Sequence, residues 1–95
     1  MVIKVMKINL DSPQKIHFIG IGGISMSAIA ELLHSKGFTV SGSDDKKSRH
    51  TEHLEALGIE IMYGNRASNI HNNLDLIVYT AAIREDNPEF RAARE

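Results

Sequence analysis

The sequence predicts an α/β fold, a doubly wound parallel sheet of the Rossmann-like type, and three observations support it. Short apolar runs that suit buried strands alternate with segments of helical spacing along residues 15–95. Closely spaced glycines stand where the first strand gives way to the first helix, and an aspartate follows at the tip of the second strand. This alternation favours right-handed crossovers and the strand order 3-2-1-4, with ligands bound at the carboxyl ends of the strands.

The first predicted strand and helix form one β–α unit. The strand covers residues 16–19, and apolar residues at helical spacing predict a helix over about 22–36, which Gly37 is placed to cap. Residues 1–14 contain a turn-like Asp-Ser-Pro break just before this unit. We treat them as an N-terminal leader with no assigned structure, followed by one domain over 15–95.

A second unit follows directly. Its strand covers residues 38–43 and ends at Asp44, and a short helix over 51–57 is closed by Gly58. A polar segment joins the strand to the helix. The β–α pattern therefore repeats.

The last part of the chain supplies two more strands and the start of a helix. The strands cover 60–63 and 76–79, the second as a continuous apolar run typical of a sheet covered on both faces, and 67–70 is read as a single helical turn. Residues 87–89, Asn-Pro-Glu, combine a capping residue, a proline at the first helical position and an acid in the first turn. Because the chain stops inside this helix, we expect a piece of a longer protein, truncated before a further strand.

Composition limits the function classes. The chain has 95 residues, 42% of them hydrophobic, and a formal charge of -1, so we expect no nucleic-acid or membrane partner. It has no cysteine, which excludes disulfides and thiolate chemistry. No apolar stretch approaches the roughly 20 residues of a membrane span, and no signal peptide is recognisable, so a cytoplasmic location is the default.

The glycine-rich run over residues 15–27 predicts a phosphate cradle. Glycine leaves no Cβ between backbone and ligand, and the helix that follows offers unpaired N–H groups and the positive end of its dipole to an anion. A nucleotide carrying a diphosphate is the expected ligand. The alternative is that the glycines serve only tight packing of strand against helix; the strand before, the helix after and the acid beyond favour the cradle.

Two further segments reach the same sheet edge. Asp44 ends the second strand, where a carboxylate can accept a hydrogen bond from a ribose hydroxyl, although a helix cap or a solvated loop also explains it. Residues 80–83 follow the fourth strand, and their small side chains permit close approach of a ligand. An ordinary exit from the strand explains them equally well.

Other kinds of site are not favoured. Residues 37–42 have the glycine spacing of an ATP-binding P-loop, but Ser43 and Asp44 stand where Lys and Ser/Thr are required. His17 and His34 are best explained as structural imidazoles. Histidines and glutamates also cluster over residues 50–55, as His50, Glu52, His53 and Glu55. No further ligand stands at metal-binding spacing, so no metal site is predicted there.

With these motifs the chain resembles the N-terminal domain of the Mur ligase family over nearly all of residues 15–95. The matching segments are 17–27, 40–44, 80–83 and 86–89. Motifs that are well separated and occur in the right order are more specific than the glycines alone.

The resemblance is strongest to the ligases of that family that add L-alanine to UDP-N-acetylmuramic acid in peptidoglycan synthesis. It implies that this domain binds the UDP part of that substrate. It also implies ATP, Mg²⁺, an ATP-binding domain and a C-terminal domain in the full-length enzyme, so this segment alone is expected to be inactive. The implied diphosphate-facing residues are Gly20, Ile21, Gly22, Gly23, Ser25, Met26 and Ser27. Asp44 would face the uridine, and Thr80, Ala81, Ala82 and Ile83 the phosphate and sugar.

The sequence departs from the family pattern at a few positions. The family usually has Gly where Ser25 stands, often Gly at Ala28, and often His at Asn65, so no base contact is assigned to Asn65. A related tripeptide-recycling ligase is the first alternative, but it typically carries Cys where Gly22 and Gly23 stand. From other classes, an NAD-sensing regulatory module shares the glycine loop and the acid, and an interaction domain that binds no nucleotide is the third possibility.

Overall fold

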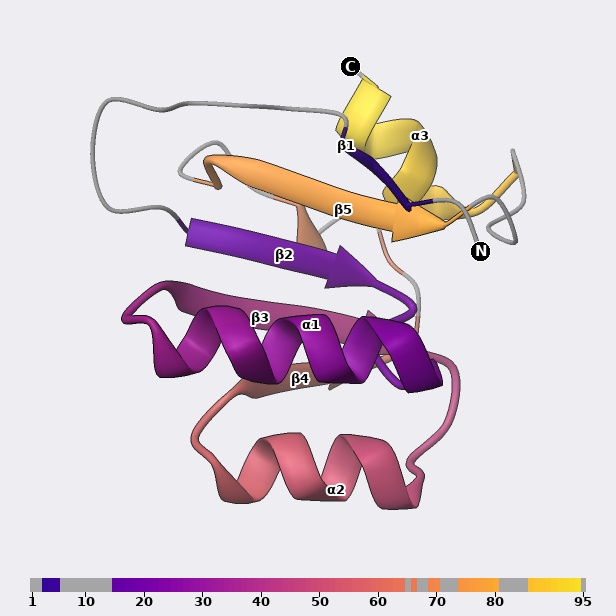
Figure 1. Cartoon of the computed structure of the whole chain (residues 1–95). Helices are drawn as coiled ribbons and strands as arrows, with labels where there is room; N and C mark the ends of the chain where they lie inside the picture. The colour runs from indigo at the N-terminus through magenta and orange to yellow at the C-terminus, as the bar shows by residue number, and fades with distance from the viewer. Residues whose placement is uncertain are drawn as a thin grey trace.

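The computed structural model describes residues 3–5, 15–64, 66, 69–70, 74–80 and 86–94. Five strands form one sheet in the order β1-β5-β2-β3-β4, and helices cover both of its faces (Figure 1). Among the described residues, no helix is long and apolar enough to cross a membrane. The elements are β1 (Ile3–Val5), β2 (Lys15–Ile19), α1 (Ile24–Ser35), β3 (Thr39–Asp44), α2 (Arg49–Ala56), β4 (Glu60–Tyr63), β5 (Leu76–Thr80) and α3 (Pro88–Arg94).

The parallel part of the sheet confirms the predicted topology. β2 pairs in parallel with β3 and with β5, and β3 pairs in parallel with β4. Numbered as the four strands predicted from sequence, β2, β3, β4 and β5 are strands 1 to 4, so the order β4-β3-β2-β5 is the predicted 3-2-1-4. The sheet is nevertheless mixed, because β1 pairs antiparallel with the outer edge of β5, with Lys4 opposite Tyr79. Part of the leader left unassigned from sequence is thus an edge strand.

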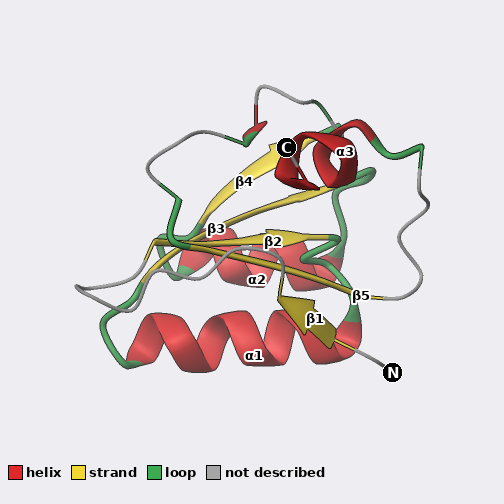
Figure 2. Cartoon of the chain, turned by 90° about the horizontal axis from the view of Figure 1, so that it is seen from above, coloured by secondary structure: helices red, strands yellow, loops and turns green. Residues whose placement is uncertain are grey.

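Side chains of successive strand residues point to opposite faces of the sheet, and each face has its own helices. α1 and α2 lie against one face and α3 against the other (Figure 2). Ile16 and Phe18 of β2 belong to the larger apolar cluster, with Met26 and Ala30 of α1 and Leu54 of α2. On the face toward α3, the described residues form a smaller apolar cluster: Ile19, Leu74 and Ile77, with Ile70, Tyr79 and Ala93 packed against it.

Glycines end the first two helices, as predicted. Gly37 has a φ of 95°, its N–H donates to His34 O at 3.1 Å, and the N–H of Phe38 donates to Leu33 O at 3.2 Å. This is a Schellman motif, which pairs carbonyls that the end of a helix otherwise leaves free. Gly58 ends α2 in the same way, with a φ of 99°.

Local chemistry explains where α2 and α3 begin. α2 starts at Arg49, two residues before the predicted position, because Ser48 caps it: the Ser48 hydroxyl accepts from Thr51 N–H, and the Thr51 hydroxyl accepts from Ser48 N–H. α3 begins at Pro88, and Asn87 Oδ1 accepts from Glu89 N–H at 2.9 Å, as the Asn-Pro-Glu signature predicts. Part of the predicted turn over 67–70 lies outside the described residues.

Candidate functional site

The glycine loop joins β2 to α1 at the carboxyl edge of the sheet. Gly20 has a φ of 83°, a left-handed conformation that favours glycine. The N–H groups of Gly20 and Ile21 both donate to Ser43 O at 2.9 Å, and the N–H of Gly23 lies 3.3 Å from Gly20 O. Both of these amides are therefore directed at β3, and a contact of Gly20 or Ile21 with a diphosphate stays a prediction.

The Ile21 side chain is also directed inward. It is fully buried and lies over Gly42 of β3, where an added Cβ would be 2.6 Å from Ile21 Cβ. Gly42 is therefore required by packing, not by a phosphate. The contact between Ile21 and Gly42 therefore packs the glycine loop against β3.

Asp44 connects the loop to the end of β3. Its Oδ2 accepts from Gly22 N–H and its Oδ1 from Asp45 N–H, each at 2.8 Å. A Cβ at Gly22 would lie 2.7 Å from Asp44 Oδ2 and 3.0 Å from Thr51 Cγ2. A side chain at Gly22 would thus collide with Asp44 and Thr51 first. A carboxylate has about four acceptor sites, so Asp44 keeps capacity for a further donor such as a ribose hydroxyl.

The amides that remain for a ligand are those of the first turn of α1. Gly23 is the N-cap, and no side chain caps the helix there and no acid stands in its first turn. Among the described residues, nothing accepts from the N–H groups of Ile24, Ser25 and Met26. Free N–H groups and the helix dipole together make such a terminus attractive to an anion.

The side chains of this turn divide into outward and inward groups. Ile24 is 77% exposed and Ser25 is exposed, whereas Met26 and Ser27 are buried. The Ser27 hydroxyl donates to Ile24 O at 3.0 Å. A ligand at this turn would therefore meet the backbone of Ile24 and Ser25 and the Ser25 side chain, but not the buried Met26.

The end of β5 is the third component of this edge. β5 runs parallel to β2, with Val78 opposite Phe18, so the Thr80 backbone emerges on the same side as the glycine loop. Ala81, Ala82 and Ile83 lie outside the described residues. Their contact with a ligand stays a prediction.

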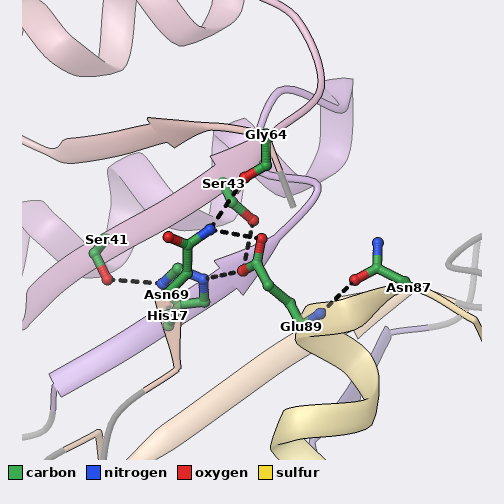
Figure 3. A network of polar contacts seen from close by, with 7 residues as sticks. All are labelled: His17, Ser41, Ser43, Gly64, Asn69, Asn87 and Glu89. Carbon is green, nitrogen blue, oxygen red and sulfur yellow. Dashed lines mark hydrogen bonds and ion pairs between the residues drawn. The ribbon is translucent and has the colours of Figure 1, made fainter. Parts of the chain in front are cut away.

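A buried polar network lies beside the loop, on the face of the sheet toward α3 (Figure 3). Glu89 Oε2 accepts from His17 Nε2 and from Ser43 Oγ, each at 2.8 Å, and Glu89 Oε1 accepts from Asn69 Nδ2 at 2.9 Å. His17 Nδ1 lies 3.0 Å from Ser41 Oγ. His17 is thus a structural imidazole, as expected from sequence.

The grouping of these residues was not foreseen. Glu89 was expected only as an acid in the first turn of a helix, and Asn69 and Ser43 had no polar role. A signal was nevertheless present: His17, Ser41 and Ser43 are polar residues at positions of central strands that share one face. Buried polar side chains need partners, so this pattern required polar groups from elsewhere in the chain.

Three further histidines of the described residues belong to α1 and α2: His34, His50 and His53. His34 Nε2 donates to Leu57 O at 2.9 Å, and His53 Nε2 lies 2.9 Å from Glu31 Oε1. Within the part of the chain that the structure describes, no group of three or more His, Cys, Asp or Glu side chains is arranged to hold a metal ion.

Fold and site together define a Rossmann-like α/β domain with an uncapped helix N-terminus at the carboxyl edge of its sheet. The sequence matches the Mur ligase family, catalytic domain, over residues 15–95. The chain belongs to the Mur ligase family.

Individual relatives agree with this assignment. The chain is 60% identical over 88 residues to the UDP-N-acetylmuramate--L-alanine ligase of Agathobacter rectalis, which covers 93% of this chain and 19% of that protein. It is 56% identical over 88 residues to the ligase of the same name from Lachnoclostridium phytofermentans, with the same coverage of both. The chain therefore spans about a fifth of the length of these relatives.

A solved structure is also similar. It is the UDP-N-acetylmuramate:L-alanyl-gamma-D-glutamyl-meso-diaminopimelate ligase from Neisseria meningitides, with a TM-score of 0.77 and 32% sequence identity. The match covers 85% of this chain and 26% of that one.

Proposed function

We propose that residues 15–95 are the UDP-binding N-terminal domain of an ATP-dependent ligase that adds L-alanine to UDP-N-acetylmuramic acid, in the cytoplasm, during peptidoglycan synthesis. The observation that carries this is the 60% identity to a relative named UDP-N-acetylmuramate--L-alanine ligase. The glycine loop and the uncapped N-terminus of α1 supply a suitable place for a diphosphate. Residues 1–14 precede this segment, and β1 within them adds an edge strand to its sheet.

The diphosphate would lie on the first turn of α1. The N–H groups of Ile24 and Ser25 are free in this turn, and both residues are exposed. Asp44 would accept from the ribose, and Thr80 with the residues after it would face the sugar. Gly20 and Ile21 would act indirectly, by holding the loop against β3.

ATP and Mg²⁺ do not fit residues 37–44, the segment with P-loop glycine spacing. This segment runs into β3, where the Ile21 side chain fills the space beside Gly42. No lysine stands where a P-loop requires one. We therefore assign both to the ATP-binding and C-terminal domains of the full-length enzyme, and we expect this chain alone to bind substrate without turnover.

Two alternative functions are separated from this proposal in different ways. A tripeptide-recycling ligase would use the same UDP site, so sequence identity has to separate it. The solved UDP-N-acetylmuramate:L-alanyl-gamma-D-glutamyl-meso-diaminopimelate ligase is 32% identical to this chain, whereas the L-alanine ligase of Agathobacter rectalis is 60% identical. An NAD-sensing module would bind NAD in preference to UDP. The glycine loop by itself does not separate these, so the ligand has to be tested.

The test is an NMR titration of the chain with UDP-N-acetylmuramic acid, UDP, NAD and ATP in parallel. We expect the two uridine ligands to shift the amide signals of residues 23–27 most, and NAD and ATP to have little effect. Selective binding of NAD, or uridine-ligand shifts confined to a distant surface, would refute the proposal.

A substitution at the first helical position sharpens this test. Ile24→Pro removes one free N–H, and proline is well tolerated at that position because its φ suits the helix. Gly23 before it has a φ of -63° and a ψ of 151°, a conformation that a following proline accepts. Loss of one charge-assisted hydrogen bond should weaken UDP binding about tenfold.

Ile24→Ala is the matched control. It removes the same exposed side chain but keeps the N–H, so UDP affinity should stay within about twofold of the unsubstituted chain. Equal affinity of the proline and alanine variants would exclude this helix terminus as the diphosphate site.

A further inference from the structure

The buried carboxylate of Glu89 connects α3 to the strands that carry the candidate site. Its side chain is fully buried, 72 residues away from its partner His17 in the sequence. Three side chains donate to it, from β2, from β3 and from the segment after β4. Glu89 is therefore the point at which these parts of the chain meet (Figure 3).

The contact with β3 leads directly to the glycine loop. Glu89 Oε2 holds Ser43 Oγ at 2.8 Å, and the carbonyl of the same residue receives the N–H groups of Gly20 and Ile21. The next residue, Asp44, receives Gly22 N–H on its carboxylate. Each of the first three loop amides is thus held by a group on Ser43 or on its neighbour.

The contact with Asn69 extends the connection to β4. Asn69 Nδ2 donates to Glu89 Oε1 at 2.9 Å and to Gly64 O at 3.1 Å, and Gly64 N–H donates to Asp44 O at 2.9 Å. The Asp44 backbone is therefore tied to Glu89 by this second route, independent of Ser43.

The network is fully satisfied, so small changes in it are costly. Within the described part of the chain, no buried side-chain N or O atom lacks a hydrogen-bond partner. All three groups that meet the carboxylate are donors, so an amide at position 89 would turn its own NH₂ toward one of them. A buried network that loses one partner leaves other groups unpaired.

We propose that Glu89 is a positioning residue for the diphosphate site. Through Ser43 and Asp44 it fixes the glycine loop, and through the loop it fixes the direction in which the first turn of α1 presents its N–H groups. This inference rests on the proposed function for the identity of the ligand. The positioning of the loop is a separate quantity and can be measured without any ligand.

The experiment uses Glu89→Gln and the milder Ser43→Ala, which removes only the hydroxyl link and keeps the carbonyl. Glu55→Gln is the matched control, because Glu55 is a half-buried carboxylate that accepts a hydroxyl hydrogen bond from Tyr63 at 2.9 Å, away from the loop. Circular dichroism first establishes conditions in which every variant is folded.

The first readout is amide hydrogen exchange without ligand. We expect exchange at Gly20 and Ile21 to rise about tenfold in Glu89→Gln relative to the β3–β4 ladder, and less in Ser43→Ala. A residue that only stabilises the fold would change exchange at all these sites together. A uniform change, or none at the loop, overturns the proposal.

The second readout compares UDP with uridine, which lacks the diphosphate. We expect Glu89→Gln to weaken UDP binding about tenfold and uridine binding, which keeps only the ribose contact proposed for Asp44, by less. The Glu55→Gln control should bind both as the unsubstituted chain does. In the double variant with Ser43→Ala, the two effects should be less than additive, because Glu89 acts partly through Ser43. Equal losses for UDP and uridine, or unchanged UDP binding, overturn the proposal.

Failure of the unsubstituted chain to bind UDP would refute the proposed function and not the positioning role. In that case the exchange at Gly20 and Ile21 decides alone, with a selective rise supporting the inference and its absence overturning it.

Discussion

Single residues decide how closely the glycine loop lies on β3. Gly42 and Ile21 are in direct contact, and no side chain fits between them without displacing Ile21. Gly22 is restricted in the same way by Asp44 and Thr51. The glycines of this region thus divide into those that packing requires and those that leave backbone exposed.

Gly42→Ala should destabilise the fold by about 1–3 kcal/mol, because overpacking a filled core forces side chains and backbone apart. The measurement is the free energy of unfolding in urea. Gly23→Ala is the control, since the nearest atom to an added Cβ there is 3.7 Å away, and it should cost less than about 1 kcal/mol. Equal effects of the two substitutions would contradict the packing account.

Burial raises the pKa of the Tyr63 hydroxyl above its ordinary value of 10.0, and the neighbouring Glu55 adds to this. The folded chain then holds this proton more tightly than the unfolded one, so the stabilisation is complete below about pH 10 and is lost as pH rises further. Absorbance titration of a Tyr79→Phe variant, which retains Tyr63 as its only tyrosine, should show the raised pKa. Adding Glu55→Gln should lower it; an unchanged titration would contradict the role of Glu55.

At the residue scale the sequence predicted which residues meet at the carboxyl edge better than it predicted their contacts. Gly20, Gly22 and Asp44 do come together at the carboxyl edge, because strand order and crossover hand bring them there. Sequence could not show that the amides of Gly20 and Ile21 turn toward Ser43, since this depends on how the loop crosses β3. It also could not pair Glu89 with His17, because nothing local links residues so far apart.

Elements are held by their ends as well as by their packing. α2 is short and has a capping box, in which the hydroxyl of Ser48 accepts from the N–H of Thr51 and the hydroxyl of Thr51 accepts from the N–H of Ser48. α1 has no such cap, and its free first turn is where the candidate ligand site lies. The N-termini of the two helices therefore differ: the N-terminus of α2 is capped, which stabilises the helix, whereas that of α1 keeps N–H groups free for a ligand.

Ser48→Ala should lower the free energy of unfolding by about 1 kcal/mol, because Thr51 N–H loses its acceptor and the cap is broken. Chemical denaturation measures this directly. Ser35→Ala is the control: Ser35 is exposed in the last turn of α1, its hydroxyl donates to Leu32 O, and alanine is a better helix former. A larger loss at Ser35 than at Ser48 would contradict the capping argument.

Elements were predictable where the pattern is local. The helix-ending glycines at 37 and 58 and the Asn-Pro-Glu start of α3 all occur as predicted, because each depends on neighbours in sequence. The start of α2 was predicted two residues too late, at Thr51. Thr51 is instead the third residue of the helix, and its N–H donates to the capping residue Ser48. β1 was not predicted, since its pairing partner is β5, far along the chain.

The molecule as a whole has one edge closed by an antiparallel strand. β1 covers the side of β5 that does not pair with β2. Without it, the outer edge of β5 would present unpaired N–H and C=O groups, which favour association with other chains.

Deletion of residues 1–14 should therefore leave a folded domain that self-associates with rising concentration. Light scattering over a concentration series is the measurement, with the unshortened chain as reference and circular dichroism as the check on folding. A shortened chain that stays monomeric over the same range would show that β1 does not protect this edge.

The position of β2 in the middle of the sheet has a consequence for the order of folding. β2 pairs on one side with β3, which follows soon after it in the sequence. Its other neighbour is β5, much further along, and the hydrogen-bond partner of His17 Nε2 is Glu89, further still. During synthesis a nascent chain would expose one flank of its central strand until nearly all of this sequence has been made. Such late, distant pairing slows folding, so growing chains of this kind depend on α3 to bury a histidine translated 72 residues before Glu89.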